Sequence, residues 1–599
     1  MSIFSKTKIN RPKHSNFGLG HDVCLSSDFF RITPTLFQKV MPGDKWRMNT
    51  ELYIRLAPML APIMARCDVK VYNFFVPIRL LWDEYETYYT GGQSGREEPV
   101  PPNVIIRKGD IEANRELFGP GSLWDYLGFP VVTEDTVIAN NFSKPICPLP
   151  FLAYYKVWQY YFSDQNLEQY DFSDTWTFPG GIQEIDDTEP DLSTDGTKRA
   201  FLELLKLRNA CWQKDYFTSA LPWPQRGQDV RLPIYGNANV VRNSESFGSD
   251  GFVDRNGNRI ITSSTAFISG SSPGPGRSGI VQRGLPPLDS TLQYEDDPGS
   301  KPNIVGVDTT YNTKVAIQST SVSYDPGNNL KVDLESASQA TINELRRGFA
   351  LQRFFEQSAR VGWRFWEYLQ GIWGVNNPDS RLQRPEFLGG GSTPVIIGEV
   401  LQTSETSTKS PLGDMAGRGV ASGNKNGFTK FFSEPGFVIS LMVVRPRSSY
   451  SQGFPRQLEM LDRYDEPNPY FAHLGEQEVK QGELYFDFNA KSFGLDEAGN
   501  EKTDNDRTFG YQSRYSEYKY IPNSYHGDFR TSLDFWHLGR RFKGAPSLNS
   551  SFVTGSSEET NHIFAVETMN GVPIDHLWCQ IHHNIKANRP LPYHGTASL

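Results

Sequence analysis

The first and last thirds of the chain alternate between apolar and polar positions in the manner of β-strands. Residues 67–76, with the sequence CDVKVYNFFV, alternate and then run apolar, which is typical of a strand with a buried face, and Pro77 ends the run. Residues 41–44, Met-Pro-Gly-Asp, are a turn signal, because proline fixes φ and glycine accepts conformations that other residues avoid. Further strands are predicted at 29–40, 46–56, 437–444, 484–488, 515–521 and 563–566.

A longer period predicts helices in the connections between these strands. In residues 150–163 large side chains recur at the 3, 4, 3 spacing of one helix face, and Pro150 suits a first helical turn. Residues 341–344 have the Thr-x-x-Glu form of a capping box, in which the two side chains satisfy each other's free amides. The helix that starts there is predicted to reach residue 373, with a break at Gly362. Helices are also predicted at 82–89 and 198–206.

One long segment differs in composition from the rest of the chain. Tryptophan is absent from residues 226–340, where Gly, Ser, Asn and Pro dominate, as in the run SGSSPGPGRSG. Loops of such length are usually functional or mobile. We therefore predict three parts: an N-terminal arm and the first part of a β-sandwich in 1–225, a surface insertion in 226–340, and a helical connection, the remaining strands and a C-terminal arm in 341–599.

Composition supports a folded, loop-rich β-protein. The 599 residues include 39 Phe, 27 Tyr and 12 Trp, and disordered chains contain few aromatic residues. Gly (52) and Pro (40) are frequent, which favours strands joined by turns over a helical bundle. The predicted fold class is mainly β: a β-sandwich or jelly roll with long loop insertions that contain several α-helices.

Several classes of protein are excluded. No run of 18 apolar residues predicts a membrane-spanning helix, and the basic, polar start of the chain does not resemble a signal peptide. The five cysteines contain no CxxC pair, which indicates reduced thiols and no disulfide framework or zinc site. The expected protein inserts into no membrane.

No catalytic motif stands out. The chain lacks GxxxxGK[ST], GxSxG and HExxH, and the three glycines at 389–391 predict a tight turn rather than a nucleotide site. His582 and His583 are neighbours and would point to opposite faces of a strand, so with His576 they favour surface or interface histidines over a metal site. No enzymatic activity, cofactor or metal is predicted.

Basic residues near both termini are candidates for contact with nucleic acid. Residues 1–14 contain no acidic side chain, and such an arm either neutralises phosphates or is only a soluble tail. The nucleic-acid-facing candidates are Lys6, Lys8, Arg11, Lys13, Lys586 and Arg589. A second set is expected in the core or between subunits, where aromatic residues concentrate. Its members are Trp82, Trp158, Trp223, Arg346, Arg347, Trp363, Trp366 and Trp536.

Motifs spread in one order over almost the whole chain resemble a known family. They are VMPGD at 40–44, NFFVPIRLLW at 73–82, LPFLAYYKVWQYYFSDQN at 149–166, DYFTSALPWPQ at 215–225, TINELRR at 341–347, DSRLQRPEFLGGG at 379–391, QTS at 402–404, FGYQSRYSEYKY at 509–520, WHL at 536–538 and RPLP at 589–592. The chain resembles the major capsid protein of the Microviridae, closest to the gokushovirus-like branch of small single-stranded DNA bacteriophages. Residues 226–340 agree least with the family.

The resemblance implies a structural protein of the virion. It implies an eight-stranded jelly roll, sixty copies of which close into a T=1 icosahedral shell around circular single-stranded DNA, assembled in the cytoplasm of a bacterial host. It further implies that the insertion forms threefold protrusions and contributes to attachment to a host surface receptor. The partners expected from the family are a minor DNA pilot protein, an internal scaffolding protein and a small basic DNA-binding protein.

The residues alone are also compatible with a second class of protein. A β-sandwich with exposed aromatic side chains and Gly-rich loops also suits a carbohydrate-binding protein or a glycoside hydrolase. A hydrolase needs two carboxylates about 5 to 10 Å apart, which the sequence does not reveal. The size of the particle formed distinguishes the two classes.

Overall fold

The computed structural model describes residues 13–168, 182–184, 196–228, 230, 342–361, 364–401, 415–459, 463, 466–495, 501–566, 568–569 and 572–594, together with seven short strands between 239 and 333. The chain separates into two compact units. The first is made of residues 1–228 and 353–599, and the second of residues 229–352. The predicted insertion at 226–340 falls mostly in the second unit.

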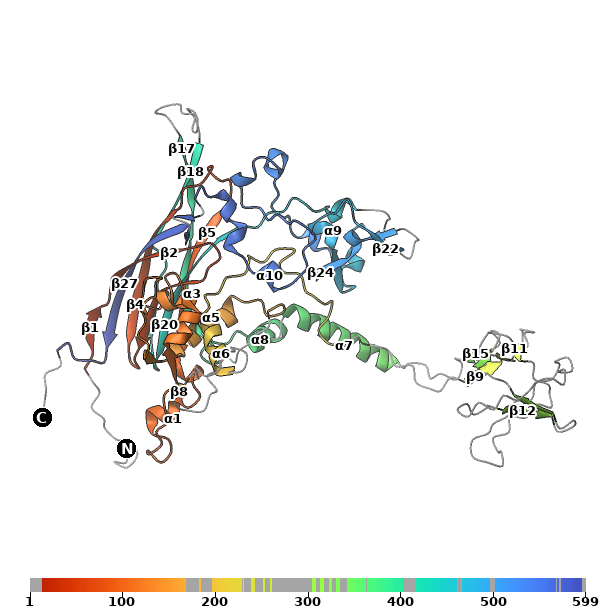
Figure 1. Ribbon diagram of the computed structural model, residues 1–599, viewed down its shortest axis with the longest axis horizontal. Helices are drawn as coiled ribbons and strands as arrows, with labels where there is room; N and C mark the ends of the chain where they lie inside the picture. Colours follow the sequence, from red (N-terminus) through yellow and green to blue (C-terminus); the bar gives the residue numbers. More distant parts are fainter. Residues whose placement is uncertain are drawn as a thin grey trace. The chain divides into compact units, whose positions relative to one another are not determined.

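The largest sheet of the first unit has seven strands, all paired antiparallel, and we call it the seven-stranded sheet (Figure 1). Its order is β1-β27-β4-β18-β17, and β2 also pairs with β27 and β19 with β4. The strands are β1 (Ser15–Gly18), β2 (His21–Ser27), β4 (Lys45–Leu56), β17 (Ile396–Leu401), β18 (Met415–Gly423), β19 (Phe428–Phe431) and β27 (Leu577–Arg589).

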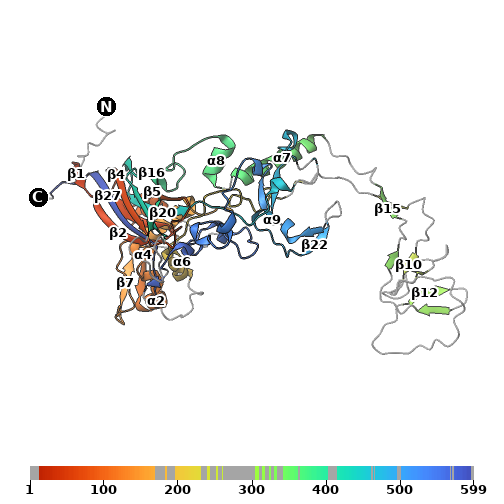
Figure 2. The same cartoon turned by 90° about the horizontal axis from the view of Figure 1, so that it is seen from above.

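A four-stranded antiparallel sheet lies against the seven-stranded sheet (Figures 1 and 2). Its order is β16-β5-β20-β3. The strands are β3 (Thr33–Val40), β5 (Cys67–Pro77), β16 (Glu386–Pro394) and β20 (Gly436–Pro446). Every second residue of β4 is buried, so one face of that strand packs inward and the other stays outward, as expected of a half-buried strand.

The inner faces of the two sheets share one hydrophobic core. Side chains of β4 and β27 from one sheet are packed with those of β5 and β20 from the other; they include Leu52, Ile54, Ile581, Val69, Val71, Met442 and Val444. A second cluster, with Trp46, Met48, Phe75, Val438 and Ile585, continues this core. Burying such side chains stabilises the fold by roughly 1.5–3 kcal/mol each, so this core contributes substantially to the stability of the unit.

The other face of the four-stranded sheet is also covered. Helix α5 (Leu149–Tyr161) contacts β5 and β20 (Figure 1), and Phe74, Ile439 and Leu441 belong to the same cluster as Phe151 and Leu152 of the helix. This double burial explains why β20 is buried along almost its whole length and reads as a continuous apolar run.

The remaining helices lie in the connections. The α-helices are α1 (Tyr85–Thr90), α2 (Lys108–Ala113), α3 (Arg115–Phe118), α4 (Leu123–Tyr126), α6 (Gly196–Leu205), α7 (Ile342–Val361), α8 (Phe365–Trp373), α9 (Gln481–Leu484) and α10 (Ser550–Val553). The 3-10 helices are η1 (Ile78–Leu80), η2 (Arg456–Leu458), η3 (Pro469–Phe471), η4 (Asp504–Asp506), η5 (Ser516–Tyr518), η6 (Gly527–Arg530), η7 (Asp534–Trp536), η8 (Ser557–Glu559) and η9 (Asn561–Ile563).

The other strands form small sheets. In the first unit these are β6 (Asn103–Arg107) with β7 (Ser143–Ile146) and β8 (Ile182–Glu184), β21 (Glu476–Lys480) with β24 (Thr508–Ser513), β22 (Ser492–Leu495) with β23 (Glu501–Thr503), and β25 (Thr568–Met569) with β26 (Val572–Pro573). In the second unit they are β9 (Asn239–Arg242) with β15 (Leu330–Asp333), β10 (Gly251–Val253) with β11 (Arg259–Ile260) and β14 (Ser323–Asp325), and β12 (Ile304–Asp308) with β13 (Thr313–Ala316).

The mainly β fold class is confirmed, and so are most predicted elements. The strands expected at 46–56, 67–76 and 437–444 are β4, β5 and β20, and the helices expected at 150–163 and 198–206 are α5 and α6. The long helix is divided into α7 and α8, as the break predicted at Gly362 requires. Gly43 adopts a φ of +91° in the predicted turn. Thr341 of the expected capping box lies outside the described residues.

Some boundaries differ from the prediction. The strand expected from residue 29 begins at Thr33, because Phe30 has a φ of +63°, a left-handed conformation that interrupts the extended backbone. The helix expected at 82–89 is α1 and begins at Tyr85. The three glycines at 389–391 do not form a tight turn but lie within β16, at a register shift of its pairing with β5.

Three predicted strands are wrong. Leu484 is the last residue of α9, a helical turn capped at its start by the Glu483 side chain, which accepts from the amide of Lys480, and residues 485–488 follow it without forming a strand. Residues 515–521 contain η5, and Tyr515 has a left-handed φ of +61°. Ile563 ends η9, and the residues after it make a single bridge, between Phe564 and Met59. Apolar side chains in these loops mimic the composition of strands.

Candidate nucleic-acid interface

One face of the seven-stranded sheet points away from the sandwich core, and we call it the outward face. On β4 the outward positions are Lys45, Arg47, Asn49, Glu51, Tyr53 and Arg55, and on β27 they are Trp578, Gln580, His582, Asn584, Lys586 and Asn588. Strand β2 adds Asp22, Cys24 and Ser26, and β18 adds Arg418, Val420 and Ser422. All of these residues are exposed or half-buried.

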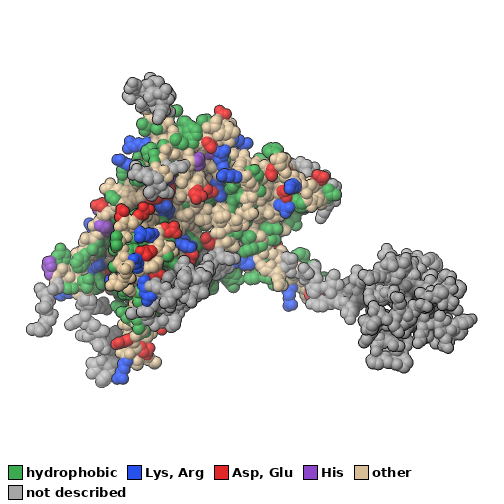
Figure 3. All heavy atoms as spheres, in the orientation of Figure 1, with side chains coloured by type: hydrophobic (Ala, Val, Ile, Leu, Met, Phe, Trp, Pro, Cys, Tyr) green, Lys and Arg blue, Asp and Glu red, His purple; other side chains and the backbone are tan. Residues whose placement is uncertain are grey.

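Positive charge dominates the outward face, although the whole chain carries −9. The charged groups are five basic residues (Lys45, Arg47, Arg55, Arg418, Lys586) and two acidic ones (Asp22, Glu51). Among the residues that the structure describes, none of the five forms a salt bridge with an acidic side chain. On the side of the molecule seen in Figure 3, by contrast, basic and acidic side chains are interspersed.

Two of these charges face each other directly. Lys586 of β27 is the cross-strand partner of Arg47 on β4, and both side chains are exposed. Like charges opposite each other in an antiparallel pair destabilise a sheet. An anionic ligand that binds the outward face would remove this repulsion.

The six predicted nucleic-acid-facing residues do not all lie on the outward face. Lys586 is on the outward face, and Lys13 is exposed just before β1, which pairs with β27 along the edge of the same sheet. Lys6, Lys8 and Arg11 lie outside the described residues.

Arg589 does not belong with the nucleic-acid-facing candidates. It follows Lys586 by three positions on β27, so its side chain turns to the inner side of the sheet. Its Nε lies 3.3 Å from a carboxylate oxygen of the fully buried Asp44, and its guanidinium lies 5.5 Å from the ring centroid of Trp46. Arg589 is therefore a structural residue that neutralises a buried carboxylate.

The predicted core or interface residues differ in burial, and their role between subunits stays a prediction. Trp82 and Trp158 are buried in the cluster around α5. Trp223, with Arg226 at 5.8 Å from its ring centroid, and Trp536 are half-buried. Arg346 and Arg347 are exposed on α7. Trp363 lies outside the described residues, and of Trp366 only the backbone position in α8 is described.

The histidines near the C-terminus point to opposite sides of β27, as predicted. His582 is on the outward face, where its Nδ1 lies 2.9 Å from a carboxylate oxygen of Asp22. His583 is fully buried between the sheets. Its Nε2 donates to the carbonyl oxygen of Thr35 at 3.0 Å, and its Nδ1 lies 3.0 Å from Thr50 Oγ1. Within the described part of the chain, no three His, Cys, Asp or Glu side chains are grouped to hold a metal ion.

Sequence reasoning missed the aromatic and basic residues at the middle of the outward face: Tyr53, Arg55, Arg418 and Trp578. A signal for three of them was present. In the segments KWRMNTELYIRL and LWCQIHHNIKANR every second residue is polar or large and exposed, so the outward set could have been read from the alternation. Which of these residues are neighbours depends on the pairing of β27 with β4.

No helix among the described residues has both the length and the apolar character needed to cross a bilayer.

Comparison with known proteins gives the family. A family model described as "Capsid protein (F protein)" matches residues 5–599. The capsid protein VP1 of Chlamydia phage 1 is 30% identical over 608 residues, which cover 100% of this chain and 97% of that protein. The VP1 of Bdellovibrio phage phiMH2K is 34% identical over 538 residues (88% of this chain, 85% of that protein), and that of Spiroplasma virus 4 is 26% identical over 616 (100% and 97%). This chain therefore belongs to the phage capsid protein (F protein) family and is a structural protein of the virion.

Proposed function

We propose that the chain is the major capsid protein of a T=1 icosahedral shell, in which sixty copies enclose circular single-stranded DNA. Membership of the capsid family establishes a shell protein that packages a genome, and not an enzyme. A DNA-facing surface is best supported by the charge of the outward face. Its five basic residues form no salt bridge with a described acidic side chain, on a chain with a net charge of −9.

The strand order supports a jelly roll. In one sheet β2, β27, β4 and β18 are neighbours, and in the other β3, β20, β5 and β16 are neighbours. Strands that follow each other along the chain, such as β2 and β3 or β4 and β5, therefore fall in opposite sheets. This is the arrangement expected of an eight-stranded jelly roll, a fold common in viral capsids.

Exposed apolar side chains support extensive contacts between copies. In the first unit, Phe365 and Trp373 of α8 are each 69% exposed, and Phe488 and Ile521 are 92% and 88% exposed. In the second unit, Phe349 of α7 is 66% exposed. Large exposed apolar side chains in several places are typical of obligate interfaces. In a closed symmetric shell each copy binds several neighbours at once, so each single contact needs to contribute only modest binding energy.

The finer partners rest on the resemblance. We propose that the second unit contributes to attachment to a host surface receptor, because it is compositionally distinct and forms its own compact unit. A minor DNA pilot protein, an internal scaffolding protein and a small basic DNA-binding protein are the further partners proposed. Assembly in the cytoplasm of a bacterial host completes the proposal.

Light scattering on the purified protein tests the shell. Sixty copies of the 67.8 kDa chain predict particles of about 4 MDa. A particle of that mass that protects single-stranded DNA from nuclease supports the proposal. A chain that stays monomeric even with the scaffolding protein added contradicts it, and a carbohydrate-binding protein or hydrolase would give that result.

A further inference from the structure

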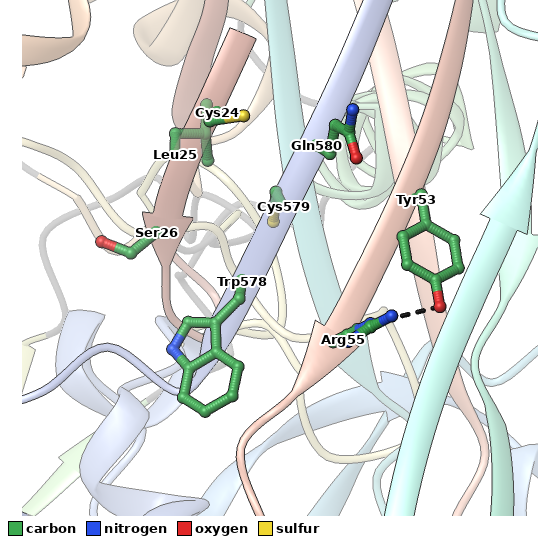
Figure 4. Close-up of a pocket in the computed structure, with 8 residues that line it drawn as sticks. All are labelled: Cys24, Leu25, Ser26, Tyr53, Arg55, Trp578, Cys579 and Gln580. Atoms are coloured by element: carbon green, nitrogen blue, oxygen red, sulfur yellow. Dashed lines mark hydrogen bonds between the residues drawn. The ribbon is translucent and has the colours of Figure 1, made fainter.

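A hollow opens in the middle of the outward face (Figure 4). It has a volume of about 610 Å³ and is formed by three adjacent strands, β2, β27 and β4. We call it the outward cleft. Its lining residues are Cys24, Leu25, Ser26, Tyr53, Arg55, Trp578, Cys579 and Gln580.

An indole forms one side of the outward cleft. Trp578 is 46% exposed, and its Nε1 donates to the backbone carbonyl oxygen of Asp575 at 3.2 Å. This bond fixes the edge of the ring and leaves part of its surface open. An exposed, oriented tryptophan is a platform on which a planar group stacks.

A cation and a phenol of β4, Arg55 and Tyr53, form the opposite side. Arg55 is the cross-strand partner of Trp578, and its Nε donates to Tyr53 Oη at 3.2 Å, with the guanidinium 5.3 Å from the Tyr53 ring centroid. Figure 4 shows Tyr53 and Arg55 joined in this way on β4. The hydrogen bond from Arg55, helped by Arg418, lowers the pKa of Tyr53. None of the lining residues carries a carboxylate; the nearby Asp575 carboxylate accepts from Ser26 Oγ at 2.7 Å and is also paired with Arg31.

An amide lies beside Trp578 on the same strand. Gln580 projects from β27 two residues beyond Trp578, opposite Tyr53, and is exposed (Figure 4). A glutamine amide carries one acceptor and two donor hydrogens, which match the edge of a nucleobase. The combination of a stacking platform, an amide and a cation free of acidic partners selects a planar, polar, anionic ligand.

We propose that the outward cleft binds one unpaired nucleotide of single-stranded DNA, its base stacked on Trp578 and its phosphate held by Arg55. Gln580 contacts the edge of the base, and Arg418 with Lys586 and Arg47 extends the path for the phosphates on either side. This site deepens the proposed function, because it rests on the outward face lying toward the packaged genome.

Fluorescence titration of the full-length protein with two probes tests the site. One probe is a 20-nucleotide oligothymidylate, and the other is an abasic phosphodiester strand of equal length. We expect Trp578→Ala to weaken binding of oligothymidylate about 5- to 100-fold, the range for one lost stack, and to leave binding of the abasic strand unchanged. Arg55→Ala should weaken both and reduce the slope of log affinity against log salt by about 0.7.

Matched variants separate the site from general effects. Trp578→Phe keeps an aromatic surface and should restore most of the affinity lost in Trp578→Ala. Tyr89→Ala and Arg381→Ala remove an exposed aromatic and an exposed basic side chain away from the sheet, and both should bind like the wild type. Circular dichroism of each variant verifies folding.

Four results would overturn the site. If the wild type binds both probes and Trp578→Ala binds them equally well, the cleft is not the nucleotide site, while the proposed function stands. If Trp578→Ala loses both probes equally, no base stacks there. If cleft variants bind DNA normally but fail to form particles, the cleft holds a segment of another copy. If the wild type binds neither probe, both the proposed nucleotide site and the DNA-packaging part of the proposed function are contradicted.

Discussion

At the scale of single residues, burial sets the chemistry of the ionisable groups in the sandwich. Among the described residues, the fully buried His583 has neutral hydrogen-bonding partners, Thr50 and the carbonyl of Thr35, and none of them is a carboxylate. Burial is the main cause that lowers its pKa from 6.5 to about 4, and the neighbouring His21 and His582 act in the same direction. The imidazole is therefore neutral in the folded protein at pH 7.

This histidine predicts acid sensitivity of the sandwich. Because the folded pKa lies below the unfolded one, the unfolded chain binds the extra proton between pH 6.5 and 4, and stability falls as pH decreases through that window. The shift corresponds to a loss of about 3 kcal/mol by pH 4.

Urea denaturation of the unassembled protein between pH 7 and 4 measures the effect. His583→Gln cannot titrate, so its stability should fall less over this range than that of the wild type. His582→Gln is the control, since that ring is on the outward face beside Asp22. Parallel pH profiles for the wild type and His583→Gln would show that His583 does not cause the sensitivity.

At the scale of elements, close approach between chains explains the glycines of β16. A Cβ on Gly390 would overlap the carbonyl oxygen of Val71 on the paired strand β5, and one on Gly391 would overlap Asn426 and the carbonyl of Lys425. These neighbours are backbone atoms or a buried side chain, so they cannot move aside at low cost. The glycines therefore permit tight packing of the four-stranded sheet rather than binding of a ligand.

Gly390→Ala is expected to destabilise the first unit by about 2 kcal/mol or more, because overpacking forces the β5–β16 pair apart. Gly398→Ala is the matched control. It lies in the edge strand β17, where the nearest atom to an added Cβ is the Arg418 carbonyl oxygen at 4.0 Å. Thermal unfolding should show a lower midpoint temperature for Gly390→Ala than for the wild type, and an unchanged midpoint temperature for Gly398→Ala. An unchanged midpoint for Gly390→Ala contradicts the packing argument.

At the scale of the whole molecule, the two compact units divide the proposed tasks. The two segments of the first unit that come just before and just after the second unit lie side by side. The amide of Arg226 donates to the carbonyl oxygen of Phe355 at 3.3 Å. A short connection can therefore replace residues 229–352 without stretching the first unit.

Replacement of residues 229–352 by a Gly/Ser linker of about six residues is expected to leave the sandwich folded and particles able to form, while attachment to host cells is lost. Light scattering measures the particles, and a cell-binding assay measures attachment. A variant that attaches to cells like the wild type contradicts the attachment role. A variant that folds but forms no particles instead places an essential subunit contact in this segment.

The basic arm gives a separate prediction for packaging. Deletion of residues 1–14 removes Lys6, Lys8, Arg11 and Lys13, and we expect it to reduce the DNA retained per particle more than the yield of particles, since these residues neutralise phosphates. Nuclease-protected DNA and particle yield are measured on the same preparation. Particle yield that collapses with packaging per particle unchanged would assign the arm to assembly instead.

The sequence by itself determined the family, the mainly β class and the elements with a strong period, such as β4, β5 and α5. The family came from motifs spread along the chain, and the elements came from their local period of 2 or 3.6 residues, because burial of one face acts on neighbours along the chain. It misjudged the loops at 484–488 and 515–521, whose apolar residues do not pair as strands: Leu484 is buried, but Phe488 and Ile521 are exposed.

Only the tertiary structure decided which residues meet. Trp578 and Arg55 are far apart along the chain and become neighbours through the register of β27 on β4, and the same register turns Arg589 inward toward Asp44 while Lys586 stays outward. A shift of one residue would exchange the two faces. Register depends on contacts between distant segments, so no local pattern of the sequence specifies it.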